Sequence, residues 1–262
     1  MKRYLVNLTF DLEEFDIPEE YGEKVSHQDQ MEITRSGTMR LLSLLDRYEV
    51  SATFFTTGNY ARQNPDLVRL VASRHEIASH ALYHDPFYVF QESDMEESKR
   101  ILEEVSGQKI TGFRMPRLKP FSMDKLRMAG YKYDSSLNPT FLPGRYNLLH
   151  ENPLPNKRFG LIELPCSCTP IIRFPLFWLA FKNLPVTLYA WLCGWTLRER
   201  HTLMLYFHPW EFADIDHFKL PGYVKKPDGE KLVRKLETLI VSLKKQGGAF
   251  VTCQSLCEEL KF

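Results

Sequence analysis

Two histidines four residues apart, His80 and His84, have a residue type and a spacing that could do chemistry. On a helical turn this spacing places both imidazoles on one face, within reach of a single metal ion. Neutral imidazole binds zinc and the neighbouring transition metals, and a carboxylate as third ligand would leave one coordination position open for water. The zinc-protease motif H-E-x-x-H does not apply, because His75-Glu76 lies one residue too far from His80. A histidine pair by itself is also compatible with a packing or capping role.

Two carboxylates follow the first apolar segment of the chain. Residues Tyr4–Phe10 predict a β-strand, and because side chains alternate along a strand, Asp11 and Glu13 should project from the same face. The carboxyl ends of strands are where α/β barrels hold their active sites. The alternative is a solvated acidic loop, since more acidic residues follow: Glu14, Asp16, Glu19 and Glu20.

An arginine and a third histidine also stand at the ends of predicted strands. Arg114 lies in Gly-Phe-Arg-Met-Pro-Arg, where a proline stops regular strand pairing. Its guanidinium could hold a carboxylate in a fixed, ionised orientation, although a surface arginine is the alternative. His208 follows the apolar segment Leu203–Phe207 and precedes a proline, which suits a barrel mouth. The alternative is a histidine whose ring is satisfied by a backbone carbonyl.

Strand and helix signals alternate along most of the chain, and these elements must position the residues above. Parallel strands joined by helical crossovers are therefore expected. With about seven or eight strands, and no Gly-x-Gly-x-x-Gly after the first, a distorted (β/α) barrel is favoured over a dinucleotide-binding fold. The predicted strands include 4–10, 52–56, 131–134, 203–207 and 249–252, and the predicted helices include 38–48, 93–105, 122–130 and 228–247, with another beginning at residue 64.

Length and composition indicate one domain. A chain of 262 residues with 44% hydrophobic residues can bury one substantial core, so we expect a single domain over residues 1–262. The segment 138–160 is rich in Pro, Asn and Gly and is predicted to form one long loop of the kind that often has a function. Lys plus Arg (34) and Asp plus Glu (33) nearly cancel, and no basic stripe indicates binding to nucleic acid.

The cysteines and the amino-terminal residues favour a reducing compartment. The five cysteines are an odd number without a C-x-x-C pair, and their spacing matches no zinc motif. Carboxylates appear early, before any apolar run long enough for a signal peptide. We therefore expect buried thiols in a cytoplasmic protein.

One aromatic stretch, Ile171–Leu197, holds three of the four tryptophans. Charged and proline residues interrupt it, so no uncharged run reaches the ~18 residues needed to span a bilayer. The simpler interpretation is a helix that covers the barrel and contributes to the core. The alternative is an exposed surface that meets a membrane or a lipid-linked sugar, because aromatic residues among a few cations suit the interface.

Four sequence motifs occur in order at the predicted strand ends: Thr-Phe-Asp-Leu-Glu, Ser-His-Ala-Leu-Tyr-His, Arg-Met-Pro-Arg and Leu-Tyr-Phe-His-Pro-Trp-Glu. Together with Gly-Tyr-Lys-Tyr-Asp-Ser-Ser-Leu, they resemble the polysaccharide deacetylase family, the NodB-homology group of carbohydrate esterases. The resemblance runs from Leu8 to His208. It implies a distorted (β/α) barrel of about seven strands that hydrolyses an acetamido group on a sugar with one divalent metal ion.

The resemblance also implies roles for individual residues. His80 and His84 match the metal-binding histidines, Asp11 the general base, Arg114 the arginine that holds this base, and His208 the general acid. Relatives commonly have two adjacent aspartates in the first motif, whereas here Leu12 separates Asp11 from Glu13. We therefore expect Glu13 to be the carboxylate ligand, with the reverse assignment to Asp11 left open. Arg117 and Trp210 are expected to contact the substrate, although Arg117 stands where many relatives have a small residue or tyrosine.

The predicted function is metal-dependent removal of an acetyl group from an N-acetylated sugar, which could belong to a polysaccharide, a glycan or a lipid-linked precursor. The expected cofactor is one zinc ion, with cobalt, nickel and manganese as alternatives. Two other functions stay open. One is hydrolysis of a small non-sugar amide, such as a ureide or cyclic imide, and the other is sugar binding without catalysis. The sequence does not indicate an oligomeric state.

Overall fold

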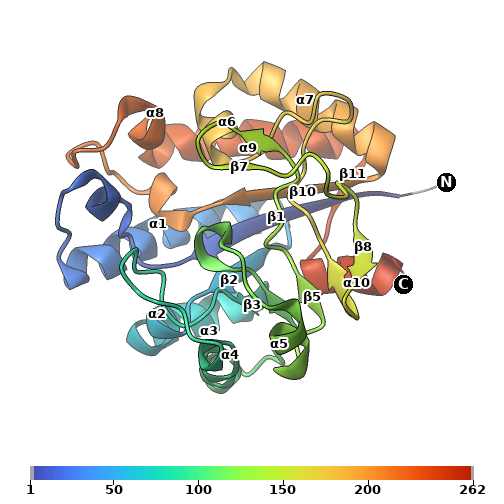
Figure 1. The fold of residues 1–262 in the computed structure, drawn as a ribbon. Coiled ribbons are helices and arrows are strands. Elements are labelled where there is room, and N and C mark those ends of the chain that lie inside the picture. The colour runs from blue at the N-terminus through green and yellow to red at the C-terminus, as the bar shows by residue number, and fades with distance from the viewer. Residues whose placement is uncertain (1–2, 261–262) are drawn as a thin grey trace.

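The structure, a computed structural model, describes residues 3–260 of the chain (Figure 1). In chain order its strands are β1 (Tyr4–Leu12), β2 (Thr53–Thr56), β3 (Glu76–Ser79), β4 (Gly112–Phe113), β5 (Tyr133–Asp134), β6 (Phe141–Leu142), β7 (Tyr146–Asn147), β8 (Asn156–Arg158), β9 (Leu161–Glu163), β10 (Thr202–Phe207) and β11 (Gly248–Phe250). The α-helices are α1 (His27–Arg47), α2 (Gly58–Gln63), α3 (Pro65–Ala72), α4 (Ser93–Ser106), α5 (Met123–Met128), α6 (Trp178–Asn183), α7 (Val186–Arg200), α8 (Gly222–Lys225), α9 (Gly229–Lys245) and α10 (Cys253–Leu260). Short 3-10 turns are η1 (Ile17–Tyr21), η2 (Pro116–Leu118) and η3 (Pro209–Phe212).

The main sheet is curled, and its strand order is β10-β1-β2-β3-β4-β5-β9-β8. All of these strands pair in parallel except β8, which is antiparallel to β9. β11 pairs with the first residues of β1, while β2 pairs with its last residues. The irregular segment that follows β9 contacts β10, since the Ser167 N–H donates to the Met204 carbonyl (2.9 Å). The prediction of a single-domain, distorted α/β barrel with about seven parallel strands is confirmed.

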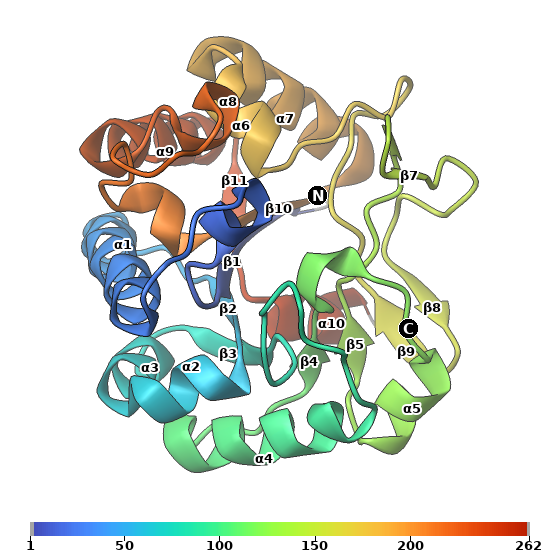
Figure 2. The same cartoon turned by 60° about the vertical axis from the view of Figure 1, so that its left-hand side comes forward.

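The alternation of side chains along β1 separates the outer core from the barrel interior. Val6, Leu8, Phe10 and Leu12 are fully buried in the main hydrophobic core between the sheet and its covering helices. Figure 2 shows α1, α3, α4, α5 and α9 arranged around the outside of the curled sheet. The intervening residues of β1, which are polar, point into the barrel. Buried polar groups need partners, so this face has to be hydrogen-bonded.

Helix α10 closes the amino end of the barrel. Its Cys253 and Leu256 belong to a small apolar cluster with Leu5 and Phe55 of the interior. The Cys253 N–H donates to the hydroxyl of Thr53 at the start of β2 (2.9 Å). With this end filled, the opposite end, where the parallel strands finish, is the one available for a site.

The first helix is longer than the sequence pattern predicted. We expected it at 38–48, but α1 begins at His27, because the Ser26 hydroxyl caps it by accepting the Asp29 N–H (3.1 Å). Met31 and Thr34 then continue the buried face toward the amino terminus. The predicted start was wrong because the first two turns carry mostly polar residues.

Two segments singled out in the sequence form regular structure. Residues 138–160, predicted to form one long loop, carry the antiparallel β6–β7 hairpin and β8. The aromatic stretch forms α6 and α7, whose Phe181 and Tyr189 are fully buried in the core. Trp191 is 58% exposed and stacks on Trp195 with ring centroids 6.0 Å apart. Contact of this surface with a membrane stays a prediction.

Among the helices of residues 3–260, none combines the length and the apolar character that crossing a membrane requires.

Candidate active site

Two carboxylates, Asp11 near the end of β1 and Glu13 just after it, are buried at the carboxyl end of the barrel. Asp11 is 3% and Glu13 is 2% exposed, and both point toward the barrel interior, as strand alternation predicted. The acidic residues after them do not all form a solvated loop, because Glu14 and Asp16 are also buried. A carboxylate removed from water needs cations or hydrogen-bond donors around it, and the next strands supply them.

Arg114 follows β4 and is the partner of Asp11. Its Nη1 donates to Asp11 Oδ1 (2.5 Å) and to the hydroxyl of Thr9 (2.9 Å), and its Nε donates to the Ser135 carbonyl (3.0 Å). The guanidinium carbon lies 4.0 Å from the centroid of the Phe55 ring. Burial alone would lower the pKa of Arg114, but the charge of Asp11 outweighs it and raises the pKa. The arginine is thus a fixed cation inside the barrel that orients Asp11.

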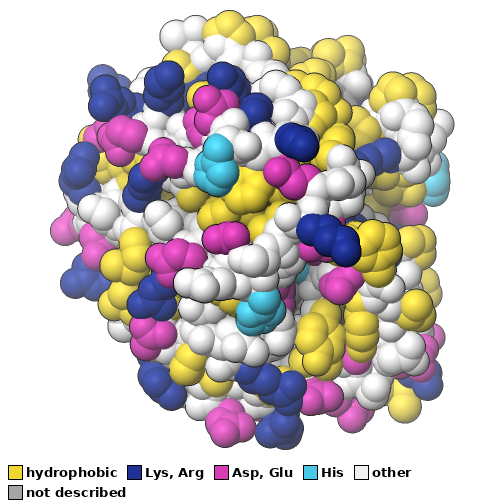
Figure 3. Space-filling view, turned by 90° about the vertical axis from the view of Figure 1, so that its left-hand side faces the viewer, with side chains coloured by type: hydrophobic (Ala, Val, Ile, Leu, Met, Phe, Trp, Pro, Cys, Tyr) yellow, Lys and Arg dark blue, Asp and Glu magenta, His cyan; other side chains and the backbone are white. Residues whose placement is uncertain are grey.

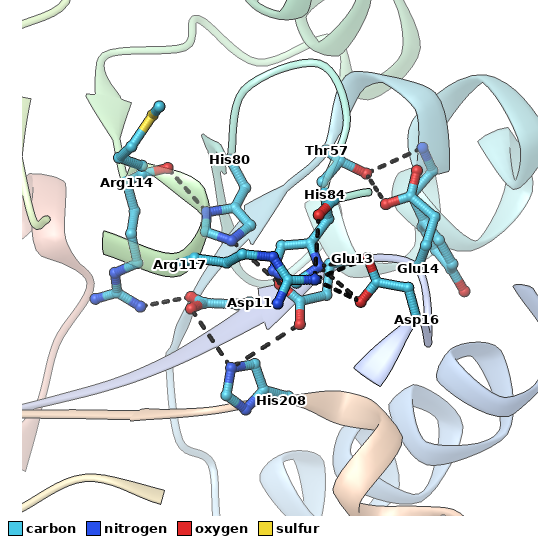
Figure 4. Close-up of polar contacts among 12 residues, drawn as sticks. Asp11, Glu13, Glu14, Asp16, Thr57, His80, His84, Arg114, Arg117 and His208 are labelled. Atoms are coloured by element: carbon cyan, nitrogen blue, oxygen red, sulfur yellow. Dashed lines mark hydrogen bonds and ion pairs between the residues drawn. The ribbon is translucent and has the colours of Figure 1, made fainter. Parts of the chain in front are cut away.

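His80 and His84 converge on Glu13, although they do not lie on a helix. The prediction of a helical turn was wrong. His80 follows the last residue of β3, and the chain turns at Ala81, whose φ is 56°, before it reaches His84 in a loop. The Nε2 atoms of both histidines lie 3.1 Å from Glu13 Oε2 (Figure 4). The end of a strand and the tight turn after it therefore bring the two imidazoles together, as the face of a helix was expected to do.

The geometry of these three side chains fits a metal ion. Their donor atoms all lie within 4.8 Å of one another. His80 Nδ1 donates to the Arg114 carbonyl (2.8 Å) and His84 Nδ1 donates to Asp16 (3.0 Å), so Nε2 is in each ring the nitrogen that faces Glu13 and that could bind an ion once deprotonated. Histidine ligands of metal sites are typically held in this way through the other ring nitrogen. Two imidazoles and one carboxylate suit zinc or another divalent transition metal, with a position left open.

The electrostatics of the cluster also favour a cation. Burial would raise the pKa of Glu13, but His84 and His208 outweigh burial and the pKa falls well below its usual range. Burial would lower the pKa of His84, but Asp16 and Glu13 raise it to about 10. The carboxylates thus stabilise positive charge at this point, and a metal ion bound between the Nε2 atoms would replace the proton on His84.

His208 follows β10 and faces both carboxylates from the other side. Its Nε2 lies 3.9 Å from Asp11 Oδ2 and 3.9 Å from Glu13 Oε1. Its Nδ1 and its backbone N–H both donate to Glu211 Oε1 (3.0 and 2.8 Å). Burial would lower the pKa of His208, but the charges of Glu13 and Glu211 raise it above 6.5. A second possible metal group, Asp11 with Glu13 and His208, is more widely spaced, and Arg114 already occupies one oxygen of Asp11.

Three residues that the sequence did not single out support this cluster. Asp16 holds His84, and Glu211 holds His208. Lys182 of α6 is buried with its Nζ 3.7 Å from Glu211 Oε2. Glu211 had a detectable signal, since Pro209 at the first position of η3 and a glutamate at the third are typical of a capping box. Asp16 and Lys182 had none, because their partners are distant in sequence.

The two predicted substrate contacts are already engaged within the protein. Trp210 is only 2% exposed, its Nε1 donates to Glu13 Oε1 (3.2 Å), and its ring stacks on His208 with centroids 5.0 Å apart. Arg117 forms ion pairs with Asp16 (3.1 Å) and with Glu20. Both side chains line the cavity, and both also position other residues of the site.

A cavity of about 420 Å³ opens over the cluster, which is within the usual range for ligand sites. Figure 3 views the molecule from this side, where hydrophobic surface lies among acidic, basic and histidine side chains. Aromatic residues form much of the wall: Tyr21, Tyr146, Phe177, Trp178, Tyr206, Trp210 and Tyr223. Asp11, Glu13, His80, His84 and His208 all lie on it as well, so these five predicted residues come together in one pocket. The sixth predicted catalytic or metal-binding residue, Arg114, does not line the cavity and contacts Asp11.

Comparison with known proteins places the chain by its family and by its fold. Residues 2–133, half of the chain, match the family model described as polysaccharide deacetylase. A curated chitooligosaccharide deacetylase from Sinorhizobium fredii is 37% identical over 67 residues, which is 25% of this chain and 30% of that protein. The chain thus matches less than a third of the length of this relative.

Two solved structures share the fold. A protein from Mycobacterium smegmatis assigned to the polysaccharide deacetylases superposes with a TM-score of 0.69 at 20% identity, over 100% of this chain and 91% of that one. A CE4 family pseudoenzyme from Bacillus anthracis has a TM-score of 0.54 at 14% identity, over 97% of this chain and 66% of that one. At these identities the likeness concerns the fold alone, so the fold by itself does not indicate activity.

Proposed function

Because this chain belongs to the polysaccharide deacetylase family, we propose that it removes the acetyl group from an N-acetylated carbohydrate by metal-dependent hydrolysis. One observation carries the proposal: three groups meet at one cavity that is walled by aromatic residues. They are a carboxylate paired with a buried arginine, a set of side chains that could bind a divalent ion, and a histidine hydrogen-bonded to a glutamate. Each of these groups has a part in amide hydrolysis.

Asp11 is the proposed general base. One of its oxygens is held by Arg114, and the other, Oδ2, faces the cavity on the side of His208. A water molecule there would transfer a proton to Oδ2 as its oxygen attacks the carbonyl carbon of the acetamide. Because the arginine fixes the orientation of the carboxylate, Asp11 can accept that proton without reorganising.

Glu13, His80 and His84 are the proposed ligands of the ion, which we take to be zinc. When bound, a divalent ion would supply Lewis acidity that polarises the acetamide carbonyl and lowers the pKa of water. The hydrogen bonds from the two Nδ1 atoms keep both imidazoles oriented toward Glu13, and Trp210 holds the other oxygen of that carboxylate. These contacts preorganise the donor set before any ion arrives.

His208 is the proposed general acid. As an imidazolium it carries a proton on Nε2, the nitrogen that faces Asp11 and Glu13, while Nδ1 stays on Glu211. When the carbon–nitrogen bond breaks, His208 would donate this proton to the departing nitrogen, because an amide nitrogen is a poor leaving group as an anion. The products are acetate and the free amino sugar.

The cavity walls suit a sugar. Tyrosine and tryptophan rings offer flat apolar surface together with a polar group, and a pyranose ring has apolar faces and polar edges. Trp210 and Arg117 are proposed to contact the substrate in addition to their contacts within the protein. Neither of these two proposed contacts requires the sugar to carry a charged group.

The experiment that tests this function measures acetate released from N-acetylglucosamine oligomers by the purified protein after chelation and reloading with zinc, cobalt, nickel or manganese. We expect release that depends on the added ion. Asp11→Asn is the control, since it should bind the same ion without releasing acetate.

A parallel panel of small amides, with a ureide and a cyclic imide, separates the alternatives. Hydrolysis of these amides without acetate release would replace the carbohydrate by a small amide. Binding of the oligomers without hydrolysis of any compound, under metal-replete conditions, would indicate a non-catalytic sugar-binding protein.

A further inference from the structure

The charged side chains that line the cavity fall into two groups. Three are acidic and three are basic: Asp11, Glu13, Glu20, Arg117, Lys119 and Arg145. The acidic ones all have cationic partners, since Asp11 pairs with Arg114, Glu13 with the histidines, and Glu20 with Arg117. Among residues 3–260, the side chains of Lys119 and Arg145 form neither an ion pair nor a hydrogen bond. The charges of these six side chains cancel, so a divalent ion on Glu13 would give the lining a net positive charge.

A tight turn brings Lys119 to the cavity. After β4 the chain passes through two consecutive residues with left-handed backbone, Arg117 (φ 58°) and Leu118 (φ 51°). Residues other than glycine seldom adopt this backbone conformation, and the backbone strain that it causes is found most often at functional sites. Arg117 is directed to Asp16 and Glu20, and Lys119 lines the cavity as an exposed cation. Of the two cations in this turn, Arg117 is therefore paired with carboxylates of the protein and Lys119 is not.

A separate segment brings Arg145 to the same cavity. It is an exposed residue in the turn of the β6–β7 hairpin, where Gly144 has a φ of 76° and the Arg145 N–H donates to the Leu142 carbonyl (3.0 Å). The hairpin is anchored by Asn138, whose Nδ2 donates to the Tyr146 hydroxyl (2.8 Å). Tyr146 lines the cavity beside Arg145. The guanidinium is therefore held near the pocket by a defined turn.

We propose that the N-acetylated sugar taken by this site carries an anionic group, a phosphate or a carboxylate, that is bound by Lys119 and Arg145. The inference rests on the proposed function and specifies its substrate class. Two cations without acidic partners, contributed by two segments to one pocket, match an anion better than a neutral sugar. An arginine and a lysine together supply the fork and the point charge that recognise such oxygens. Solvated surface cations are the ordinary alternative, and they would not discriminate between substrates.

The test compares kcat/KM for acetate release from N-acetylglucosamine 1-phosphate and from neutral methyl N-acetylglucosaminide, with N-acetylmuramic acid as the carboxylate. We expect the wild-type protein to prefer an anionic substrate by about tenfold or more. In the double variant Lys119→Gln with Arg145→Gln this preference should fall close to one. The matched control is Lys157→Gln with Lys231→Gln, which removes the same charge from exposed positions outside the cavity and should keep the preference.

A binding measurement keeps the inference separate from catalysis. Calorimetric titration of the zinc-loaded Asp11→Asn protein with the same three compounds should show the same preference, lost in the variant that also lacks both cations. Equal kcat/KM for all three compounds would overturn the anionic substrate and leave deacetylation standing. Absence of acetate release, with anion-selective binding retained, would overturn deacetylation and leave the anion site. A preference for phosphate over carboxylate, or the reverse, identifies the anionic group, and a lipid-linked phosphate presented in micelles tests whether the natural source is a lipid.

Discussion

Glu13 and Glu76 are two buried glutamates that face the inside of the same barrel from opposite ends. Glu13 lies beyond the carboxyl end of β1 and Glu76 at the amino end of β3, with 2% and 7% of their surfaces exposed. Burial pushes the pKa of both carboxyls upward. At Glu13 the histidines reverse this effect, and the pKa falls well below its usual range.

Around Glu76 the contacts are neutral. The hydroxyls of Tyr133 and Thr53 each donate to it at 2.7 Å, and the Gln254 N–H donates at 3.0 Å. These hydrogen bonds lower the pKa without outweighing burial, so it stays above 4.5. Burial is therefore not what makes a carboxylate functional in this barrel. The histidines that converge at one end suit Glu13 to the proposed role of metal ligand, and around Glu76 the hydrogen-bonding partners are neutral groups.

The largest expected effect is that of Glu13→Gln. This change removes the carboxylate ligand, so we expect loss of the divalent ion and a fall in deacetylation of about a thousandfold or more. Elemental analysis of the reloaded protein and acetate release are the measurements. Glu76→Gln is the matched control, an identical change at the other end of the barrel, and should keep both the ion and the activity. An equal loss in the two variants would remove the distinction between the two ends.

Asp11→Asn should separate two carboxylates at the same end. Because a base acts on the proton of water, the variant should hold the ion with wild-type affinity and lose about a thousandfold in kcat. If Asp11→Asn loses the ion while Glu13→Gln retains it, the roles of base and ligand are reversed.

His208→Ala should lower kcat about a hundredfold and leave the ion bound. Since Glu13 and Glu211 raise the pKa of His208, a larger fraction of it is imidazolium at neutral pH than for an ordinary histidine, and the wild-type rate should fall as the pH rises through that pKa. The variant should lack this alkaline limb. An unchanged pH–rate profile would limit His208 to a structural role.

Asp16→Asn tests a carboxylate that touches His84 and not the substrate. We expect affinity for the ion to weaken between about ten- and a hundredfold, because His84 loses the charged carboxylate that orients it and keeps at most a neutral amide acceptor. Activity at saturating metal should stay within a few fold of wild type. Ion titration followed by activity measurement separates the two effects, and a large loss of kcat at saturating metal would place Asp16 among the reacting groups.

The smallest effect concerns stability at the Glu76 end. Because the native pKa lies above 4.5, the folded state binds a proton more tightly than the unfolded state, so this group contributes less stability as the pH rises above 4.5. Glu76→Gln has no proton to lose. The difference in free energy of unfolding should thus shift in favour of the variant between pH 5 and pH 8, as measured by urea denaturation. A constant difference would mean that Glu76 titrates alike in both states.

Much of the barrel follows from local sequence patterns. The alternation along β1 correctly predicted that Asp11 and Glu13 share a face, because a strand has a period of two wherever it is placed. Parallel strands bring their carboxyl ends to one edge, so motifs at the ends of β1, β3, β4 and β10 could be expected to meet. Two predictions from local pattern were wrong. The start of α1 was missed because its first helical turns are polar, and His80 and His84 were expected on a helical turn but are joined by a tight non-helical turn.

The sequence by itself determined two things. These are the order in which the motifs follow the strands along the chain, and the face of the sheet to which Asp11 and Glu13 belong. Only the tertiary structure decided which groups surround each charge. His84 is hydrogen-bonded to Asp16, and Glu211 lies beside Lys182. Neither contact could be predicted from the sequence. Nor does the residue type distinguish Glu13 from Glu76, since each lies in a motif-like stretch at one end of a β-strand. The physical reason is that a pKa depends on burial and on charges close in space, and folding alone brings those charges from distant positions to within about 4 Å.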